Sequence, residues 1–575
     1  MFSVADVIHQ QYPDLAKRPF IAKPLIYLLR QLLHETDIRE FVERYPHLDG
    51  IDFVEQVLDY FNVTYSVRDN EKQHIPSTGK VVIIANHPIG SLDGLALLKL
   101  VHEVRTDVKV MANQMLMSVK ALNNLLLPVN NMGGNTPKEN MNNIHAHMQN
   151  EGALLIFPAG EVSRLRPQGI RDTKWHSGFY RIAKQHNAPI LPLFIDAKNS
   201  PLFYSMSMIY KPLSTALLVK EMFKQRKAHF PIRIGKIIPP QSYSARNLNL
   251  KQTVKLFKKH LYAIAQNKPL VFDVQNPIAL PENRSVLQQE LKQRCQLLGE
   301  TSDNKRIYLY EHHESSAIMR EVGRLREIAF RAVGEGTLNK RDIDQYDSDY
   351  YHLLIWDNND LEIVGAYRFG DATKLVTPAS NNLYSATLFD YSEKMNPYFA
   401  QGLELGRSFV QPRYWGKRSL DYLWYGIGAF VRQYPQYRYL FGPVSLSDAY
   451  PEKAKQAIVH FYQRYFGYGG SGCGECVTAK IPFILKEPPA IDFVGDDYKA
   501  DFTALKHYLQ SMGLNIPTLF KQYTEIAEDG GVCFHAFNID PEFNNCIDGL
   551  IMVDMQMLKK KKRERYLGES EVNLD

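Results

Sequence analysis

Short apolar runs, each followed by turn residues, organise the first half of the chain. Residues 81–85 (VVIIA), 154–157 (LLIF) and 189–195 (PILPLFI) are rich in β-branched and large aliphatic side chains, the pattern of buried strands. A helix-like stretch through Gln185 lies between the second run and the third. This alternation of strands and helices predicts an α/β domain.

The second half shows both helical and strand patterns. Apolar residues at 318, 322, 325, 328 and 329 fall on one face of a helix, and basic residues lie on its other side. Residues 352–356 and 362–368 flank the turn residues 358–360, which predicts a hairpin. We expect a further strand over 403–410, and helices over 286–300 and 420–432.

Length and composition support two domains. A chain of 575 residues is longer than one hydrophobic core usually supports, and its 45% content of hydrophobic residues is enough for two cores. Prolines and polar residues interrupt the periodicity between 266 and 290. We therefore expect a first α/β domain over 1–265, a linker over 266–290 and a second α/β domain over 291–575.

Candidate chemistry follows the first apolar run directly. His87 and Asp93 lie in the loop after it, where site residues tend to gather. A histidine near neutral pKa can take the proton of an attacking alcohol, and a carboxylate can fix its tautomer and stabilise the imidazolium. The alternative is a turn in which Asn86 and Asp93 only satisfy backbone groups and His87 only packs.

A second block makes the catalytic interpretation stronger. Residues 154–164 again lead from a strand into a turn, with Gly160 and Glu161 at its centre. Together with residues 174–195, the two blocks resemble the glycerolipid acyltransferase family over about residues 60–240. The resemblance implies transfer of a fatty acyl group from a thioester to a lipid hydroxyl. It also implies that His87 is the general base and Asp93 its partner, with Asn86, Gly160 and Glu161 near the substrate.

The chain departs from that family in three places. Five residues separate His87 from Asp93 instead of four, a variant of the haemolysin-like and ornithine-lipid branch, and Gly90 can absorb the extra residue. Ala159 takes the usual glutamate position, and the acid follows at 161. In the second block, around residues 127–131, asparagine replaces an arginine expected to bind a phosphate, which argues for an acceptor with another head group.

The second half resembles the GNAT-type acyltransferases over about residues 300–485, in the branch of the acyl-homoserine lactone synthases and ornithine N-acyltransferases. The residues that match this family in order and spacing are Arg326, Phe330, Asp344, Asp347, Arg368, Glu404 and Arg407. A basic loop after the strand, with Arg413, Gly416, Lys417 and Arg418, is of the kind that binds phosphate at a helix start. The same loop also fits an ordinary charged surface turn.

The resemblance implies an amino acid acceptor and an acyl carrier protein as donor. Asp344 or Asp347 could hold the ammonium of ornithine, and Glu404 could take a proton from the attacking amine. The alternative is that Glu404 and Arg407 make separate structural salt bridges. Arg418 stands where the family has a small residue, which favours carrier-bound phosphopantetheine over coenzyme A, although coenzyme A thioesters stay possible.

Charge and cysteine content bear on the partners, the location and the cofactors of the protein. The net charge is +6, with basic clusters at 220–229 and 559–565 that favour an anionic membrane surface over nucleic acid. Residues 18–33 have the pattern of an interfacial element, or equally of a packed helix. No apolar stretch reaches the length of a membrane span, so we expect a cytoplasmic protein, peripheral on the inner membrane face. Five cysteines with a single CxxC at 473–476 predict reduced thiols and no metal or other bound cofactor.

The two halves together resemble the bifunctional ornithine lipid synthases of bacteria. The resemblance implies that the second domain acylates the α-amine of ornithine with a 3-hydroxyacyl group. The first domain then esterifies that hydroxyl in lyso-ornithine lipid. Alternatives are glycine, lysine or glutamine as head group, a lysophospholipid acyltransferase with a degenerate GNAT domain, and a non-catalytic, haemolysin-like membrane-binding protein.

Overall fold

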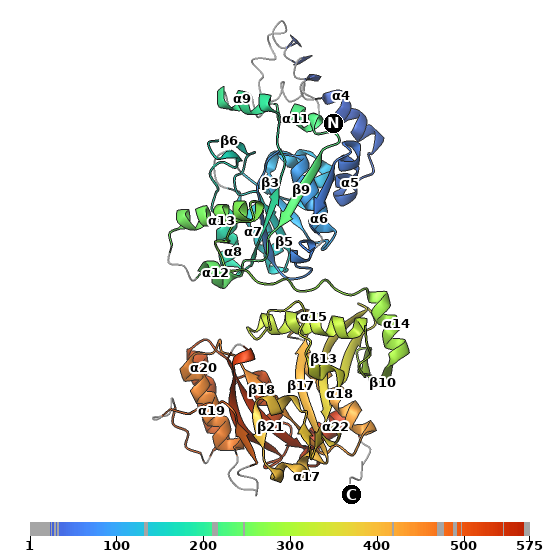
Figure 1. Cartoon of the computed structure of the whole chain (residues 1–575), viewed down its shortest axis with the longest axis vertical. Coiled ribbons are helices and arrows are strands. Elements are labelled where there is room, and N and C mark those ends of the chain that lie inside the picture. Colours follow the sequence, from blue (N-terminus) through green and yellow to red (C-terminus); the bar gives the residue numbers. More distant parts are fainter. Residues whose placement is uncertain are drawn as a thin grey trace. The chain divides into compact units, whose positions relative to one another are not determined.

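The chain folds into two compact units, Met1–Leu280 and Pro281–Asp575 (Figure 1). Their boundary lies inside the segment 266–290, where the sequence predicts a linker. The computed structural model describes all residues except 1–22, 25, 28–29, 32–33, 69, 131–135, 210–216, 245–247, 417–418, 468–475, 487–490, 496, 544 and 569–575. None of the helices in this described part is long and apolar enough to cross a membrane.

A seven-stranded mixed sheet forms the N-terminal domain. All neighbouring strands are parallel except β8 and β9, which are antiparallel. The spatial order is β1 (Thr64–Val67), β9 (His229–Ile234), β8 (Ile190–Ile195), β2 (Val81–Ala85), β5 (Ala153–Ile156), β3 (Lys109–Asn113) and β4 (Leu126–Val129). The three predicted strands are therefore confirmed, and they lie next to one another at the centre of the sheet.

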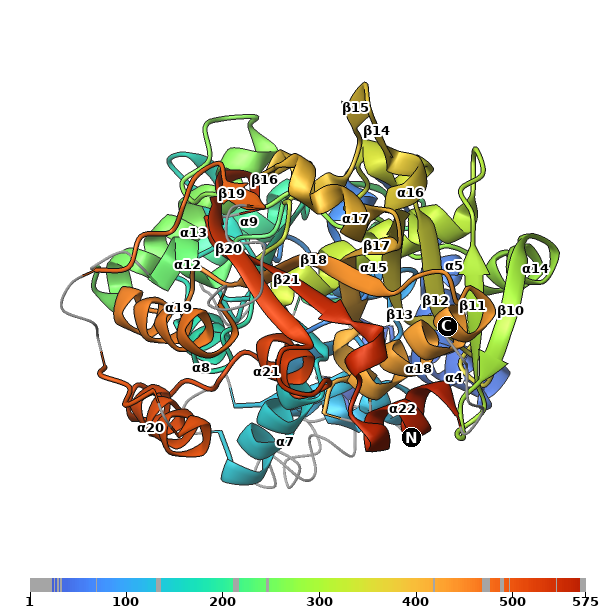
Figure 2. The ribbon, with the colours of Figure 1, turned by 90° about the horizontal axis from the view of Figure 1, so that it is seen from below.

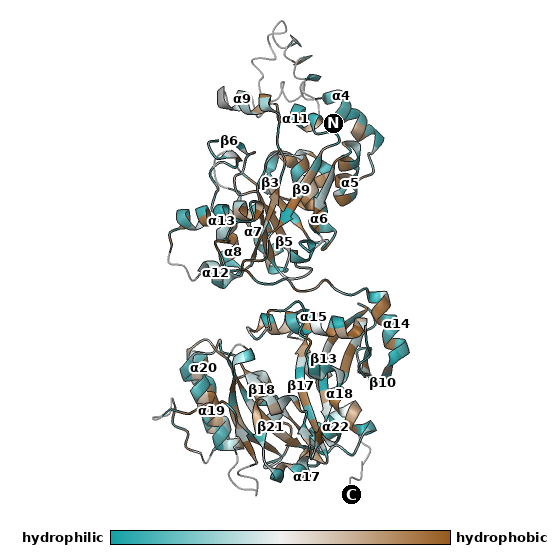
Figure 3. Ribbon diagram, viewed as in Figure 1, coloured by the Kyte–Doolittle hydropathy of each residue, from teal (hydrophilic) through white to brown (hydrophobic). Residues whose placement is uncertain are grey.

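Helices cover both faces of this sheet, because β2 is apolar on both sides. Val81, Ile83 and Ala85 contribute to one core, whereas Val82 and Ile84 contribute to the other. The central strands stand out as hydrophobic in Figure 3. The first core includes α5 (Gly50–Tyr60) and α6 (Leu92–His102), and the second includes α7 (Lys138–Gln149), α8 (Gly178–Gln185) and α13 (Leu250–Ala265).

An eight-stranded sheet forms the C-terminal domain. Its neighbours are antiparallel except β17 and β18, which are parallel. The order is β10 (Cys295–Glu300), β11 (Lys305–Tyr310), β12 (Tyr351–Asp357), β13 (Glu362–Asp371), β17 (Gly402–Val410), β18 (Tyr439–Leu446), β21 (Cys546–Asp554) and β20 (Val532–Asp540). The predicted hairpin and the strand over 403–410 are confirmed.

Three clusters of buried apolar residues include residues of this second sheet. One contains residues of α14 (Arg284–Arg294) and α15 (Ala317–Ala332), and another contains Phe441 of β18 with Leu550 and Met552 of β21. The largest contains residues of α18 (Ser419–Gln433), α19 (Glu452–Phe466), α20 (Tyr498–Ser511), α21 (Thr518–Thr524) and α22 (Lys560–Leu567). Figure 2 shows α19 and α21 near β20 and β21. Both domains are α/β, as the sequence predicts.

Two sequence predictions are wrong in this domain. The helix expected over 286–300 ends at Arg294, and the following residues form β10, because pairing with β11 satisfies their backbone groups. The expectation of reduced thiols fails at Cys476, which is disulfide-bonded. Cys295, Cys533 and Cys546 are free.

Strands β17 and β18 diverge after a short parallel contact. They pair only from Gly402 and Tyr439 to Glu404 and Phe441, whereas β18 stays paired with β21 up to Leu446. The separation leaves a cavity of about 100 Å³ between the two strands. A diverging pair of central strands is thus the feature of the sheet that creates a binding space.

The last close approach before the strands separate gives a test. A Cβ on Gly442 would lie 2.0 Å from the carbonyl oxygen of Leu405, so Gly442→Ala should destabilise the domain by about 1–3 kcal/mol. The matched control is Gly406→Ala, because a Cβ there meets nothing within 4 Å. Denaturation followed by tryptophan fluorescence reports mainly on this domain, which holds Trp356, Trp415 and Trp424 of the four tryptophans. Equal stability of the two variants would contradict the close approach.

Candidate active sites

The first candidate site lies where β2 ends and α6 begins. His87 Nδ1 is 3.1 Å from Asp93 Oδ2, and the ring of Phe157 lies against the imidazole with centroids 4.2 Å apart. Asp93 is fully buried, while the side chain of His87 keeps 17% of its surface exposed. The imidazole is therefore reachable from outside, and its carboxylate partner is not.

Backbone N–H groups hold the Asp93 carboxylate in place. Those of Ile89 and Gly94 donate to it at 2.9 Å each, and that of Gly90 donates at 3.1 Å. Gly90 has a φ of 99°, and a Cβ there would lie 2.4 Å from Val162 Cγ1. Only glycine suits this conformation and space, so Gly90 accommodates the five-residue spacing between histidine and aspartate.

Their surroundings shift the pKa values of both His87 and Asp93. Burial lowers the pKa of His87, but its interactions with Asp93 and the charge of Asp172 together outweigh burial, so that the net pKa is above the ordinary value of 6.5. Burial raises the pKa of Asp93, yet His87 and the N–H groups of Ile89 and Gly90 bring it below its ordinary value. Asp93 therefore stays ionised and stabilises a positive imidazole, as a general base requires.

Asp172 joins this loop to the second block, and no sequence motif predicts this role. Its Oδ1 accepts hydrogen bonds from Ser163 Oγ at 2.6 Å and from the backbone N–H of His87 at 3.2 Å. Trp175 Nε1 donates to Oδ2 at 2.8 Å, and the N–H of Ser163 donates to the carbonyl of His87 at 2.7 Å. The buried Asp172 carboxylate thus fixes the backbone on which His87 sits.

The other predicted residues of this site have distinct positions. Asn86 is buried and exchanges two 2.9 Å hydrogen bonds with the backbone of Ile195, so its amide ties β2 to β8. Gly160 is exposed with a φ of 64°, and Glu161 lies 3.8 Å from Arg164. An open pocket of about 420 Å³ is lined by Glu161, Arg164, Leu165, Arg166, Thr173, Lys174, His176 and Ser207.

The second candidate site surrounds Glu404 on β17. Its buried carboxylate accepts hydrogen bonds from the hydroxyl of Tyr350 and from the backbone N–H groups of Tyr384 and Ser385, at 3.1 and 2.7 Å. Glu404 makes no ion pair with Arg407, and none with another described cation. The alternative in which Glu404 forms a structural salt bridge is therefore wrong.

The remaining matched residues form an ion network. Asp347 lies 2.7 Å from Arg326 and 3.1 Å from Arg368, and Asp344 lies 2.6 Å from Arg368 and 3.3 Å from Arg407. Arg326 and Arg368 bring the pKa of Asp347 below its ordinary value despite burial. Since both carboxylates already neutralise guanidinium groups, this geometry gives no support to their holding the ammonium of ornithine.

Arg407 occupies an unusual backbone position. Its φ is 51°, and the pairing of β13 with β17 shifts register beside it, between Ala366 and Arg368. The guanidinium lies over the rings of Tyr384 and Phe543, 5.0 and 5.1 Å from their centroids. This bulge turns Arg407 toward the cavity between β17 and β18, which it lines.

Phe330 and the predicted phosphate loop are the remaining residues that the sequence predicts for this site. Phe330 lines the same cavity. Arg413 lies 2.5 Å from both Asp360 and Glu362, so its charge is already matched, and Gly416 has a φ of 75°. Lys417 and Arg418 lie outside the described residues. The part of the loop that is described thus resembles a charged surface turn more than a phosphate site.

Comparison with known proteins agrees with this division of the chain. Residues 6–268 match the acyltransferase family, and residues 325–425 match the acetyltransferase (GNAT) domain. The first range contains His87, and the second contains Glu404.

Among the individual relatives, some are named N-acyltransferases and others O-acyltransferases. The chain is 31% identical to a glycine N(alpha)-acyltransferase of Bacteroides thetaiotaomicron, over 50% of this chain and 89% of that protein. It is 29% identical to a lyso-glycine lipid O-acyltransferase of the same species, over 42% and 90%. It is 26% identical to an L-ornithine N(alpha)-acyltransferase of Agrobacterium fabrum, over 43% and 78%. The chain therefore belongs to the family of the glycine N(alpha)-acyltransferase, and it is an acyltransferase that joins an acyltransferase domain and a GNAT domain in one polypeptide.

Proposed function

We propose that this enzyme makes a phosphorus-free aminolipid in two successive acyl transfers. The C-terminal domain joins a 3-hydroxyacyl group to the α-amine of an amino acid, and the N-terminal domain esterifies the new 3-hydroxyl with a second acyl chain. The observation that carries this proposal is the presence of both matches, to an N-acyltransferase and to a lyso-lipid O-acyltransferase, in one chain. The product of the first transfer is the acceptor of the second.

In the second transfer, His87 acts as general base. Its imidazole takes the proton of the 3-hydroxyl while the oxygen attacks the carbonyl carbon of an acyl thioester. The C–O bond forms, the C–S bond breaks, and the proton passes from His87 to the leaving sulfur. Asp93 stabilises the imidazolium from the time it takes up this proton until it gives it to the sulfur.

In the first transfer, the attacking amine must lose a proton. Glu404, held by two backbone N–H groups and Tyr350, takes this proton directly or through Tyr350. The amine then attacks the carbonyl carbon of the donor's thioester. The C–N bond forms, the C–S bond breaks, and the leaving sulfur takes up the second proton that the nitrogen loses. We propose acyl carrier protein as that donor, with coenzyme A thioesters as the alternative.

Two amino acids are candidates for the head group. The order of the matched residues in the C-terminal domain favours ornithine, and an ornithine acyltransferase is among the relatives. The glycine N(alpha)-acyltransferase of Bacteroides thetaiotaomicron covers more of this chain, at higher identity, than the ornithine acyltransferase of Agrobacterium fabrum, which favours glycine as the second candidate. Basic clusters at 220–229 and 559–565 support action at the inner surface of the cytoplasmic membrane.

Loss of the His87 base should stop the second transfer, ester formation, and leave the first transfer, amide formation, intact. In bacteria that express His87→Ala, we expect the monoacylated aminolipid to accumulate and the diacylated form to fall at least about 100-fold, because the hydroxyl has no base. Mass spectrometry of extracted lipids measures both species and identifies the head group. Diacylated product at the normal level would contradict the assignment of His87.

The raised pKa of His87 sets the pH dependence of ester formation. Only the neutral imidazole accepts a proton, so kcat/KM should rise with pH through an apparent pKa above 6.5. In Asp93→Asn the carboxylate charge is gone, so the apparent pKa should fall while the maximal rate drops by about 10²–10⁴. A variant with an unchanged pH profile would show that Asp93 does not set the proton affinity.

Replacement of Glu404 tests the amide-forming site separately. Glu404→Gln should lower amide formation by about 10²–10⁴, whereas esterification of supplied lyso-lipid should continue at the wild-type rate. Glutamine keeps one acceptor oxygen, which can bond the N–H of Ser385, whereas its NH2 group then faces the N–H of Tyr384, so an unchanged melting temperature is the control for folding. Normal yield of the monoacylated lipid would remove Glu404 from the mechanism.

A further inference from the structure

The cavity between β17 and β18 has acidic groups that none of the roles above uses. Its acidic lining residues are Glu335 and Asp548, its basic residue is Arg407, and apolar and aromatic side chains such as Phe330 and Tyr384 supply much of the remaining wall. At about 100 Å³ it is large enough for a small polar group and too small for an acyl chain. The cavity therefore fits part of the acceptor better than the hydrocarbon of the donor.

Asp548 is built into the sheet at this point. It lies on β21, opposite Ser445 of β18 and Asn538 of β20, and it is 3% exposed. Ser445 Oγ donates a hydrogen bond to Asp548 Oδ1 at 2.7 Å. The carboxylate is thus fixed in direction and faces the space that opens where β17 leaves β18.

The acids here have no matching cation. Among the described residues, no lysine, arginine or histidine lies within ion-pair distance of Glu335, Asp540 or Asp548, whereas Asp344 and Asp347 are paired with arginines. A buried carboxylate without a counter-charge holds a proton or awaits a cation. Burial accordingly raises the pKa of Asp548 to about 6 and that of Glu335 to about 7.

We propose that Asp548, with Glu335 beside it, binds the ammonium group of the amino acid acceptor. The inference rests on the proposed N-acylation and names the groups that recognise its acceptor. Arg407, the basic residue of the cavity, already pairs with Asp344 and Asp342 at 3.3 and 3.7 Å. The charge left without an ion pair in the cavity is therefore negative, which suits the ammonium group of the acceptor.

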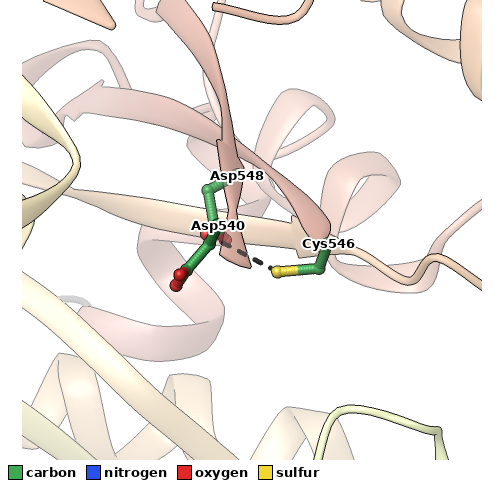
Figure 4. Close-up of side chains that lie close together, drawn as sticks. All are labelled: Asp540, Cys546 and Asp548. Atoms are coloured by element: carbon green, nitrogen blue, oxygen red, sulfur yellow. Dashed lines mark hydrogen bonds between the residues drawn. The ribbon is translucent and has the colours of Figure 1, made fainter. Parts of the chain in front are cut away.

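A metal ion is the competing occupant. Figure 4 shows Asp540, Cys546 and Asp548 side by side, and their ligand atoms lie within 4.8 Å of one another. However, Cys546 Sγ lies 3.6 Å from Asp548 Oδ2 as a hydrogen-bond donor, and burial raises the pKa of this thiol. Metal binding needs the thiolate, so an ammonium group suits this cluster better.

The test uses Asp548→Asn in the full-length enzyme, with initial rates measured against glycine and against ornithine and a 3-hydroxyacyl carrier protein as donor. Asparagine keeps the acceptor for Ser445 and removes the charge, so KM for the amino acid should rise at least about tenfold while KM for the donor stays unchanged. The matched control is Asp554→Asn on the same strand, since Asp554 pairs with Arg438 and does not line the cavity.

The two amino acids distinguish which ammonium group is bound. An equal rise of KM for glycine and ornithine places the α-ammonium at Asp548, and a rise for ornithine alone places the side-chain ammonium there. Either result supports the subsite. An unchanged KM for both in an active enzyme would overturn it, as would loss of wild-type activity with EDTA that zinc alone restores. A wild-type enzyme that acylates neither amino acid would contradict the proposed function itself.

The variant should fold, because the charge it removes does not stabilise the domain. The folded pKa of Asp548, about 6, exceeds the ordinary value of 3.8, so the fold loses stability as pH rises between these values. Asparagine cannot ionise, and the melting temperature at pH 8 should not fall. If Asp548→Asn is nevertheless unfolded, Glu335→Gln, at a partly exposed position after α15, provides the same KM comparison.

Discussion

A carboxylate inside a sheet must be matched by a proton, a cation or directed N–H groups, and each centre of this enzyme satisfies that constraint differently. Asp93 has three backbone N–H groups and an imidazole. Glu404 has two backbone N–H groups and a phenol, and Asp347 has two guanidinium groups. Asp548 has only neutral donors. The way each charge is balanced indicates what the group can do, from orienting a base to binding a cation.

The two domains place their chemistry by different uses of a sheet. In the first, a parallel strand buried on both faces ends in a loop, and the following helix begins with the aspartate that orients the histidine. In the second, two parallel central strands separate after three paired residues, and the acidic and basic side chains line the opening. Both arrangements attach polar groups to a rigid, apolar sheet, which limits their movement.

Much of this arrangement follows from local sequence patterns. The apolar run 81–85, the spacing of His87 and Asp93, and the order of Arg326, Arg368 and Glu404 predict the fold class and bring the right residues together. Contacts between distant segments could not be predicted in this way. Asp172 reaches His87 across 85 positions, and Asp548 faces the cavity only because of the register between β21 and β18. The sequence predicts a helix where β10 forms, because the local propensity of these residues does not reflect their pairing with β11.

The central claim is that two acyl-transfer centres in one polypeptide act in succession on the same molecule. The most direct measurement follows purified full-length enzyme with ¹⁵N-labelled glycine or ornithine, acyl donor and lipid vesicles, with products identified by mass spectrometry over time. The account predicts that label enters a monoacyl amide first and then passes into a diacyl product that contains an ester. A product esterified before any amide forms, or label that never enters lipid, would contradict it.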